Sequence, residues 1–318
     1  MRKRTTLILG VAVVLIAIAA LAFYLHAKAA PRAARLLPEA DAIVFLDVAP
    51  LRLATHFDRD PITRSPDFQQ FIDATGIVPE RDLDAAAFAL HAMPNPHGPN
   101  GPVAFSEVFV GRFDAARLTR YLASIASAQE TYAGHTLYLI PSDGRTLRVA
   151  QLDATTIAAS NCPTPEQIHA ILDRSRGSFV SGPLLLSARY ADVPSFASAW
   201  AIGRIGLPFA EDGHISVMGL GLPLASDTDF VASLRYTSQL HLRIEQLAPS
   251  DADAQQSSQA LTGLLAVLRT LEPVPARTDS DRTLRDLTAS IHIQQKKNRA
   301  ILTADLPADL LKRLGQLH

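Results

Sequence analysis

The stretch VAFSEVFVGRFDAARLTRYLASI, residues 103–125, has the clearest secondary-structure pattern in the chain. Its first nine residues, 103–111, are rich in β-branched and aromatic side chains and predict a strand. Asp114 then predicts the N-cap of a helix. That helix has one apolar face, formed by Leu118, Tyr121, Leu122 and Ile125. A strand that leads into a capped amphipathic helix indicates a sheet with a helix packed on it.

The residues that follow predict more strands and a second helix. Residues 135–140, 147–151 and 155–160 each have the composition of a strand. Thr164-Pro165-Glu166-Gln167 matches a capping box with proline at the first helical position, so we expect a helix to begin there. Strands that follow one another directly favour an antiparallel sheet covered by helices over a doubly wound parallel sheet.

Working outward in both directions, the same criteria predict the remaining elements. Towards the N-terminus we expect strands at 42–48 and 85–91, a helix beginning at Ser65-Pro66, and an exposed loop at 93–102. Towards the C-terminus we expect strands at 184–189, 215–222, 230–236, 240–247, 288–294 and 299–305, and helices at 193–205, 251–271 and behind Pro307. Alternation within 240–247 predicts that one face of this part of the sheet is wet.

We therefore expect an α+β fold: an N-terminal transmembrane helix followed by antiparallel sheets covered by helices. The order strand, helix, strands, helix occurs twice, from Val103 to Ser175 and from Leu240 to Leu314. This order suggests two similar α+β halves, 31–190 and 191–318, which could also form one continuous domain.

Composition excludes several classes of protein. The chain has 318 residues, a formal net charge of -1 and 48% hydrophobic side chains, so it is not a generally basic nucleic-acid binder. Cys162 is its only cysteine. A disulfide within the chain and a CxxC zinc site are both excluded, so the folded part of the chain must be held together by its core.

Much of the apolar excess lies in one segment, LILGVAVVLIAIAALAFYL, from Leu7 to Leu25. A helix of about nineteen residues nearly crosses the hydrocarbon layer of a bilayer, and residues 2–4 form a basic flank on its N-terminal side. We expect an anchor in the cell membrane, through Leu7 to Leu25, with the N-terminus in the cytoplasm. The alternative is a signal peptide cleaved after Ala29 or Ala30. Both alternatives place the remaining chain outside the cytoplasm.

No established motif for catalysis or cofactor binding occurs: the nucleophile elbow, the H-E-x-x-H zinc motif, the P-loop and the calcium loop are all missing. We therefore predict no catalytic residues, no cofactor site and no metal site. His56, Asp58 and Asp60 could converge on a cation if extended, but Pro61 and Arg59 favour a solvated loop.

Other candidates have simpler interpretations. His91 and His97 flank the 93–102 loop and are expected at the surface. Lys296, Lys297 and Arg299 form a small basic cluster that fits a wet hairpin tip. Two further features complete the set: Gly219-Leu220-Gly221, which we interpret as part of a packed strand, and Cys162, which we expect to be an unreactive residue in a turn.

The segment Leu37-Pro38-Glu39-Ala40-Asp41, followed by 43–47 and Leu51-Arg52, resembles the opening of certain bacterial single-pass membrane-anchored extracytoplasmic proteins of uncharacterised function. Residues 110–114, with Leu118 and 121–122, and later 132–134 before 137–138, are similar to their strand-to-helix-to-strand core. The resemblance covers about the first half of the chain. It implies an exported α+β domain and no catalytic residues.

The leading hypothesis is a non-catalytic extracytoplasmic domain that binds or scaffolds other envelope components and does not contact nucleic acid. One alternative is an envelope hydrolase with a dispersed site, which a deep pocket holding a histidine or carboxylate with a perturbed pKa would favour. Another is a carrier of an apolar ligand, suggested by the Ala- and Leu-rich segment around Trp200 and supported by any internal apolar cavity.

Overall fold

The computed structural model describes most of the chain after the N-terminal apolar segment. The described residues are 29–59, 64–98, 100–177, 182–204, 216–217, 220–221, 228–237, 239–270, 285–286 and 288–306. The segment Leu7–Leu25 and the helix expected behind Pro307 lie outside them. No helix within the described part is long and apolar enough to cross a membrane.

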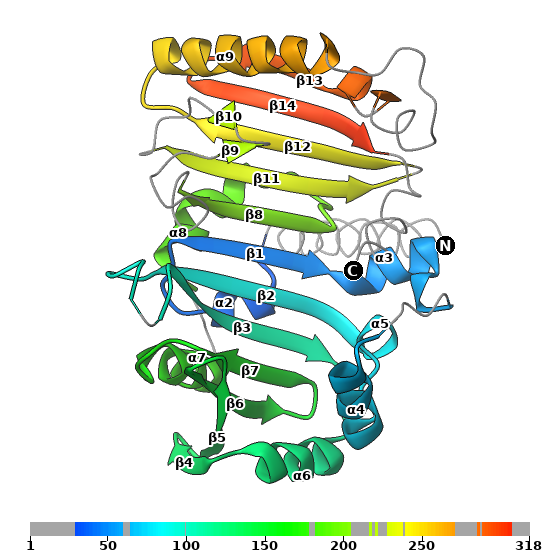
Figure 1. The fold of residues 1–318 in the computed structure, drawn as a ribbon, viewed down its shortest axis with the longest axis vertical. Helices are drawn as coiled ribbons and strands as arrows, with labels where there is room; N and C mark the ends of the chain where they lie inside the picture. Colours follow the sequence, from blue (N-terminus) through cyan, green and yellow to red (C-terminus); the bar gives the residue numbers. More distant parts are fainter. Residues whose placement is uncertain are drawn as a thin grey trace, which may run out of the picture.

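One sheet of twelve antiparallel strands forms the centre of the molecule (Figure 1). Its order is β13-β14-β12-β11-β8-β1-β2-β3-β7-β6-β5-β4. The strands are β1 (Ala42–Asp47), β2 (Leu83–Ala92), β3 (Val103–Gly111), β4 (Ala128–Tyr132), β5 (His135–Ser142), β6 (Arg145–Asp153), β7 (Thr156–Ser160), β8 (Ala199–Arg204), β11 (Asp229–Tyr236), β12 (Leu240–Leu247), β13 (His292–Lys296) and β14 (Arg299–Leu306). The two-residue strands β9 (Ser216–Val217) and β10 (Leu220–Gly221) pair separately.

The helices are short, apart from one. They are α2 (Arg32–Leu36), α3 (Val48–Thr55), α4 (Pro66–Thr75), α5 (Pro79–Asp82), α6 (Ala115–Ile125), α7 (Glu166–Arg176), α8 (Leu184–Arg189) and α9 (Asp251–Thr270), with 3-10 turns η1 (Phe57–Arg59) and η2 (Tyr190–Asp192). Figure 1 places α9 at the β13 end of the sheet and α4 and α6 at the opposite end.

The expected fold class needs correction in two respects. In place of several sheets of similar size, the described chain forms one large sheet, with the short β9–β10 pair separate from it. Its strand β1 pairs with β2 on one side and with β8 on the other. The transmembrane helix of the expected fold is not supported, because no described helix could span a membrane.

Two apolar clusters lie on opposite faces of the sheet. The larger contains Ile43, Phe45, Trp200 and Ile202 from the central strands, and buried residues of α2, α7 and α8 cover it. In the smaller cluster, α6 contributes Leu118 and Leu122, which pack with side chains of β5, β6 and β7. Adjacent residues of a strand point to opposite faces, so Val149 belongs to one cluster and Ala150 to the other.

Two neighbouring elements were predicted with the wrong secondary structure. Residues 184–189 form helix α8, where a strand was expected, and residues 199–204 form strand β8, where a helix was expected. β8 lies between β1 and β11 and pairs with both. An Ala-rich apolar run fits a strand buried on both faces as well as it fits a buried helix, and pairing on both sides selects the strand here.

Two smaller expectations also differ from the structure. Strand β4 was not expected, because its sequence AQETY is polar and exposed at the sheet edge. The capping box at 164–167 does not form: Pro165 is the N-cap of α7 and no side chain caps the helix. Ser65 and Asp114 do cap α4 and α6, as predicted.

Candidate functional site

The candidate site begins at the register of the two central strands. Phe45 of β1 lies directly opposite Trp200 of β8. Their side chains therefore share a face of the sheet, and the rings stack with centroids 5.5 Å apart and planes 26° apart. Trp200 is 3% exposed. This aromatic pair forms the floor of the site.

The walls come from the segment that leads into β8. Tyr190, in η2, packs edge-on against Trp200 with ring centroids 5.4 Å apart. The chain then runs over the aromatic floor from Val193 to Ala197 before it enters the sheet. Phe196 in this run has a φ of 64° and is 73% exposed. A bulky side chain rarely adopts a positive φ, so this backbone holds an exposed aromatic ring at the site at a conformational cost.

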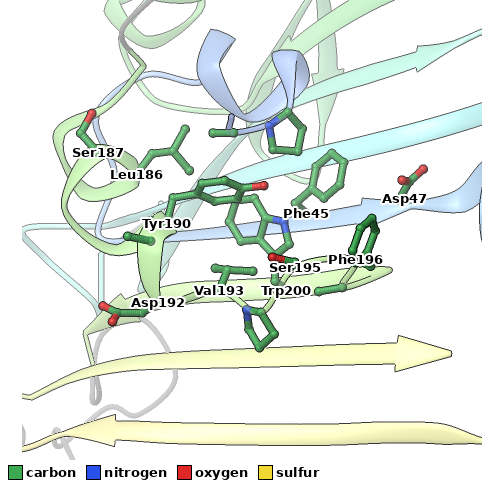
Figure 2. A pocket seen from close by; sticks show the side chains of 15 residues that line it. Phe45, Asp47, Leu186, Ser187, Tyr190, Asp192, Val193, Ser195, Phe196 and Trp200 are labelled. Carbon is green, nitrogen blue, oxygen red and sulfur yellow. The ribbon is translucent and has the colours of Figure 1, made fainter. Parts of the chain in front are cut away.

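These elements line a cavity of about 650 Å³ that is open to solvent on one side, with a volume within the range of small-molecule binding sites. Figure 2 shows the aromatic side chains in its centre, with Asp47 near one end and Asp192 near the other. The lining residues are Ala30, Pro31, Phe45, Asp47, Leu186, Ser187, Tyr190, Ala191, Asp192, Val193, Pro194, Ser195, Phe196, Ala197 and Trp200.

Ion pairs hold the Asp192 end of the cavity against the sheet. Asp192 accepts a hydrogen bond of 2.8 Å from Arg299 of β14. Arg299 also binds Glu245 of β12 at 2.9 Å, and Arg243 binds the same carboxylate at 2.7 Å. Although we expected Glu245 on the wet face, it is buried and satisfied by these two guanidinium groups. Together with the Arg189–Asp229 pair, they fix η2 onto β11, β12 and β14.

Asp47 at the other end differs, because its carboxylate makes no hydrogen bond or ion pair with any described residue. Burial raises the pKa of this carboxyl above its usual value, and the nearby Asp84 raises it further. Asp84 itself is paired with Arg52 at 2.6 Å. The cavity therefore contains one acidic group without a counterion.

The lining offers little for acid–base or nucleophilic chemistry. It includes Ser187 and Ser195, but no histidine, cysteine or lysine among the described residues. A serine nucleophile needs an adjacent base, and the described lining holds none beyond the carboxylates.

Two hydroxyl–histidine arrangements in the described part lie outside the cavity lining. Thr237, His241 and Asp305 are hydrogen-bonded in a row at the surface, with the Thr237 hydroxyl 2.9 Å from His241. The other arrangement is closed to solvent. His91 of β2 is 3.0 Å from the hydroxyl of Ser106 on β3, which is 3.0 Å from that of Ser160 on β7. Ser106 is 0% exposed, so a substrate cannot reach it. Burial lowers the pKa of His91, an effect opposed by Asp41 and by a hydrogen bond to the Glu39 backbone. The cluster joins three strands through buried polar contacts.

The sequence-based candidates do not converge on a site. His56 and Asp58 are exposed, and Asp60 lies outside the described residues. His91 is buried, contrary to expectation, and His97 is exposed in the loop. No group of three or more metal-ligating side chains occurs in the part of the chain that the structure covers.

The remaining candidates are structural. Lys296 and Lys297 are exposed at the β13–β14 turn, whereas Arg299 belongs to the ion-pair network. Cys162 is buried, and burial raises the pKa of its thiol, which keeps it protonated. Of Gly219-Leu220-Gly221, Leu220 and Gly221 form β10, and Gly219 lies outside the described residues.

Sequence reasoning singled out Trp200 but not its partners. The sequence does not indicate that Phe45, Tyr190 and Asp47 belong to a site. Phe45 and Asp47 have only the pattern of a buried strand, and Tyr190 follows residues that were predicted as another strand. Their proximity depends on the β1–β8 pairing, which no local pattern in the sequence reveals.

Comparison with known proteins adds a distant likeness. No family model and no curated protein matches the sequence. The structure of crystal form I of TP0453 matches with a TM-score of 0.46 and 14% identity, covering 92% of this chain and 99% of that one. Crystal form III of TP0453 matches with a TM-score of 0.48 and 13% identity, over 91% of this chain and 99% of that one.

Proposed function

We propose that this protein is a non-catalytic binding protein that carries an apolar ligand in the cavity above Phe45 and Trp200. The observation that carries the proposal is the cavity of about 650 Å³ itself, which has an aromatic floor and walls rich in apolar side chains. The apolar segment at the N-terminus favours export, so we place the domain outside the cytoplasm.

The form of the cavity supports a ligand with an extended or flat apolar body. Phe45, Trp200 and Tyr190 present ring faces and edges that pack against alkyl chains or aromatic rings. Leu186 and Val193 extend this apolar surface (Figure 2). Burial of apolar ligand surface gains about 25 cal/mol per Å², which provides the driving force for binding.

A hydrolase is less well supported. The serine–histidine pair at Ser106 and His91 is buried away from solvent, and the described lining of the cavity has serines but no histidine. A catalytic serine must meet both a base and a substrate. These two conditions are not met together at the described lining of the cavity, and the hydrogen-bonded row of Thr237, His241 and Asp305 lies outside that lining.

Trp200 provides a direct test, because it is the only tryptophan in the sequence and it lies in the floor of the cavity. We expect 1-decanol, added to the full-length protein below its solubility limit, to change the intrinsic fluorescence in a saturable way. Phe196→Ala should weaken this binding about threefold to tenfold, because it removes an exposed ring at the cavity without creating a hole in the core.

Leu53→Ala is the matched control. Leu53 is 75% exposed, as Phe196 nearly is, but it lies on α3 and does not line the cavity. This variant should bind decanol as the wild type does. Fluorescence that changes only linearly with added decanol, or an equal loss in both variants, would contradict the proposed function.

A further inference from the structure

The charges around the cavity indicate what kind of ligand it takes. Phe45 and Asp47 are two residues apart on β1, so both side chains point to the same face of the sheet. Asp47 thus lies next to the aromatic floor, and Figure 2 shows Phe196 on the same side of the cavity. The carboxylate is half-buried at one end of an apolar surface.

The acidic groups near the cavity are otherwise neutralised within the described chain. Asp192 is paired with Arg299, Asp229 with Arg189, and Asp84 with Arg52. Asp47 alone among them has no partner. No lysine or arginine occurs among the described residues that line the cavity. Partial burial of an uncompensated carboxylate is unfavourable, and a cationic group bound beside it would remove that cost.

The aromatic rings add a second attraction for positive charge. A cation within about 6 Å of the centre of an aromatic ring is attracted to the ring face, and tryptophan is the best such partner. Phe45 and Trp200 form the floor, and Phe196 is held in a left-handed backbone conformation at the exposed side. Aromatic rings are a common means of binding substituted ammonium groups in proteins.

We propose that the cavity binds a cationic amphiphile, with its apolar body against Phe45, Trp200 and Tyr190 and its ammonium end at Asp47. This inference rests on the proposed function, because it assigns the charge of a ligand whose apolar part the cavity accepts. It also gives Asp47 a role that the fold does not require: Asp47 is the N-cap residue of α3, yet its side chain makes no capping hydrogen bond.

Three probes with the same alkyl chain and different head groups test the inference. They are decyltrimethylammonium, 1-decanol and decyl sulfate, each kept below its aggregation limit and followed by Trp200 fluorescence of the full-length protein. We expect the ammonium compound to bind about tenfold more tightly than decanol, and decyl sulfate to bind more weakly than decanol.

Asp47→Asn keeps the size of the side chain but removes its charge, and no capping hydrogen bond is lost because Asp47 makes none. This variant should lose about tenfold in affinity for decyltrimethylammonium and keep its affinity for decanol. The matched control is Asp143→Asn, at an exposed turn position whose φ of 48° asparagine tolerates well. It makes the same change in net charge away from the cavity and should leave all three affinities unchanged.

The results separate this inference from the proposed function. Equal affinities for the three probes, or an Asp47→Asn variant that binds decyltrimethylammonium as the wild type does, would overturn the ammonium site and leave the apolar carrier standing. A loss of decanol binding in Asp47→Asn would also overturn it, since the carboxylate would then act on the structure of the cavity. If no probe gives a saturable response, both proposals fail.

Discussion

Glu107 is an acid placed between apolar neighbours in the sheet: its cross-strand partners are Phe88 on β2 and Ala159 on β7. Burial raises the pKa of this carboxyl from 4.5 to about 7. Between these two values the folded state binds more protons than the unfolded state. The contribution of Glu107 to stability is therefore most favourable below pH 4.5 and is lost as the pH rises through about 7.

We expect Glu107→Gln to remove this pH dependence. The variant should be about 2–3 kcal/mol more stable than the wild type at pH 8, and this advantage should shrink towards pH 4.5. Urea unfolding of both proteins across this range measures the difference. His91 also makes the stability depend on pH, because its lowered pKa makes it destabilising in acid. The difference in free energy of unfolding between the variant and the wild type cancels this effect, since both proteins contain His91. Glu130→Gln, on the exposed edge strand β4, is the control. If the difference in stability between Glu107→Gln and the wild type did not depend on pH, the prediction would be contradicted.

At the scale of a single element, α9 is the long helix of the described chain, and it contains a glycine that nothing requires. A Cβ added at Gly263 would meet no atom of the described residues within 4 Å. Gly263→Ala should therefore stabilise the protein by about 0.5–1 kcal/mol, because alanine loses less backbone entropy in a helix. Thermal unfolding followed by circular dichroism measures this as a higher melting temperature.

Gly203→Ala, on β8, is the opposite case. Its Cβ would lie 2.6 Å from the Cβ of Ala42 and 3.1 Å from the carbonyl oxygen of Asp41, so the strand pairing must shift. We expect this substitution to lower the melting temperature, since overpacking costs roughly 1–3 kcal/mol. The expected effects of these two Gly→Ala changes have opposite signs, which separates the effect of helix propensity from that of packing. A lower melting temperature for Gly263→Ala would refute the first.

At the scale of the whole molecule, the ranges 31–190 and 191–318 meet inside one sheet, where β1 pairs with β8. Trp200 lies at this junction and reports on it. We expect one cooperative transition, because strands of both ranges share the larger apolar cluster. Urea curves from Trp200 fluorescence and from far-UV circular dichroism should coincide. Separate midpoints would support two independently folding halves, so this experiment also tests the predicted domain division.

The sequence by itself determined the elements whose signals are local. Ser65 and Asp114 begin helices where predicted, because an N-cap side chain bonds to backbone amides two or three residues away. β3 and β12 have the predicted bounds, since alternation and composition act within the strand itself. The Ala- and Leu-rich segment around Trp200 also suggested a site for an apolar ligand, although it did not identify the other residues that line the cavity.

Only the tertiary structure decided how distant segments meet. The strand conformation of β8, its pairing with β1 and the burial of His91 depend on partners far away in the sequence, and the free energy of burying a shared face overrides local propensity. The cavity follows from the same pairing, which brings Phe45 and Asp47 to Trp200. Sequence periodicity reports which face of an element is apolar, but the contact between two such faces is fixed only when the whole sheet forms.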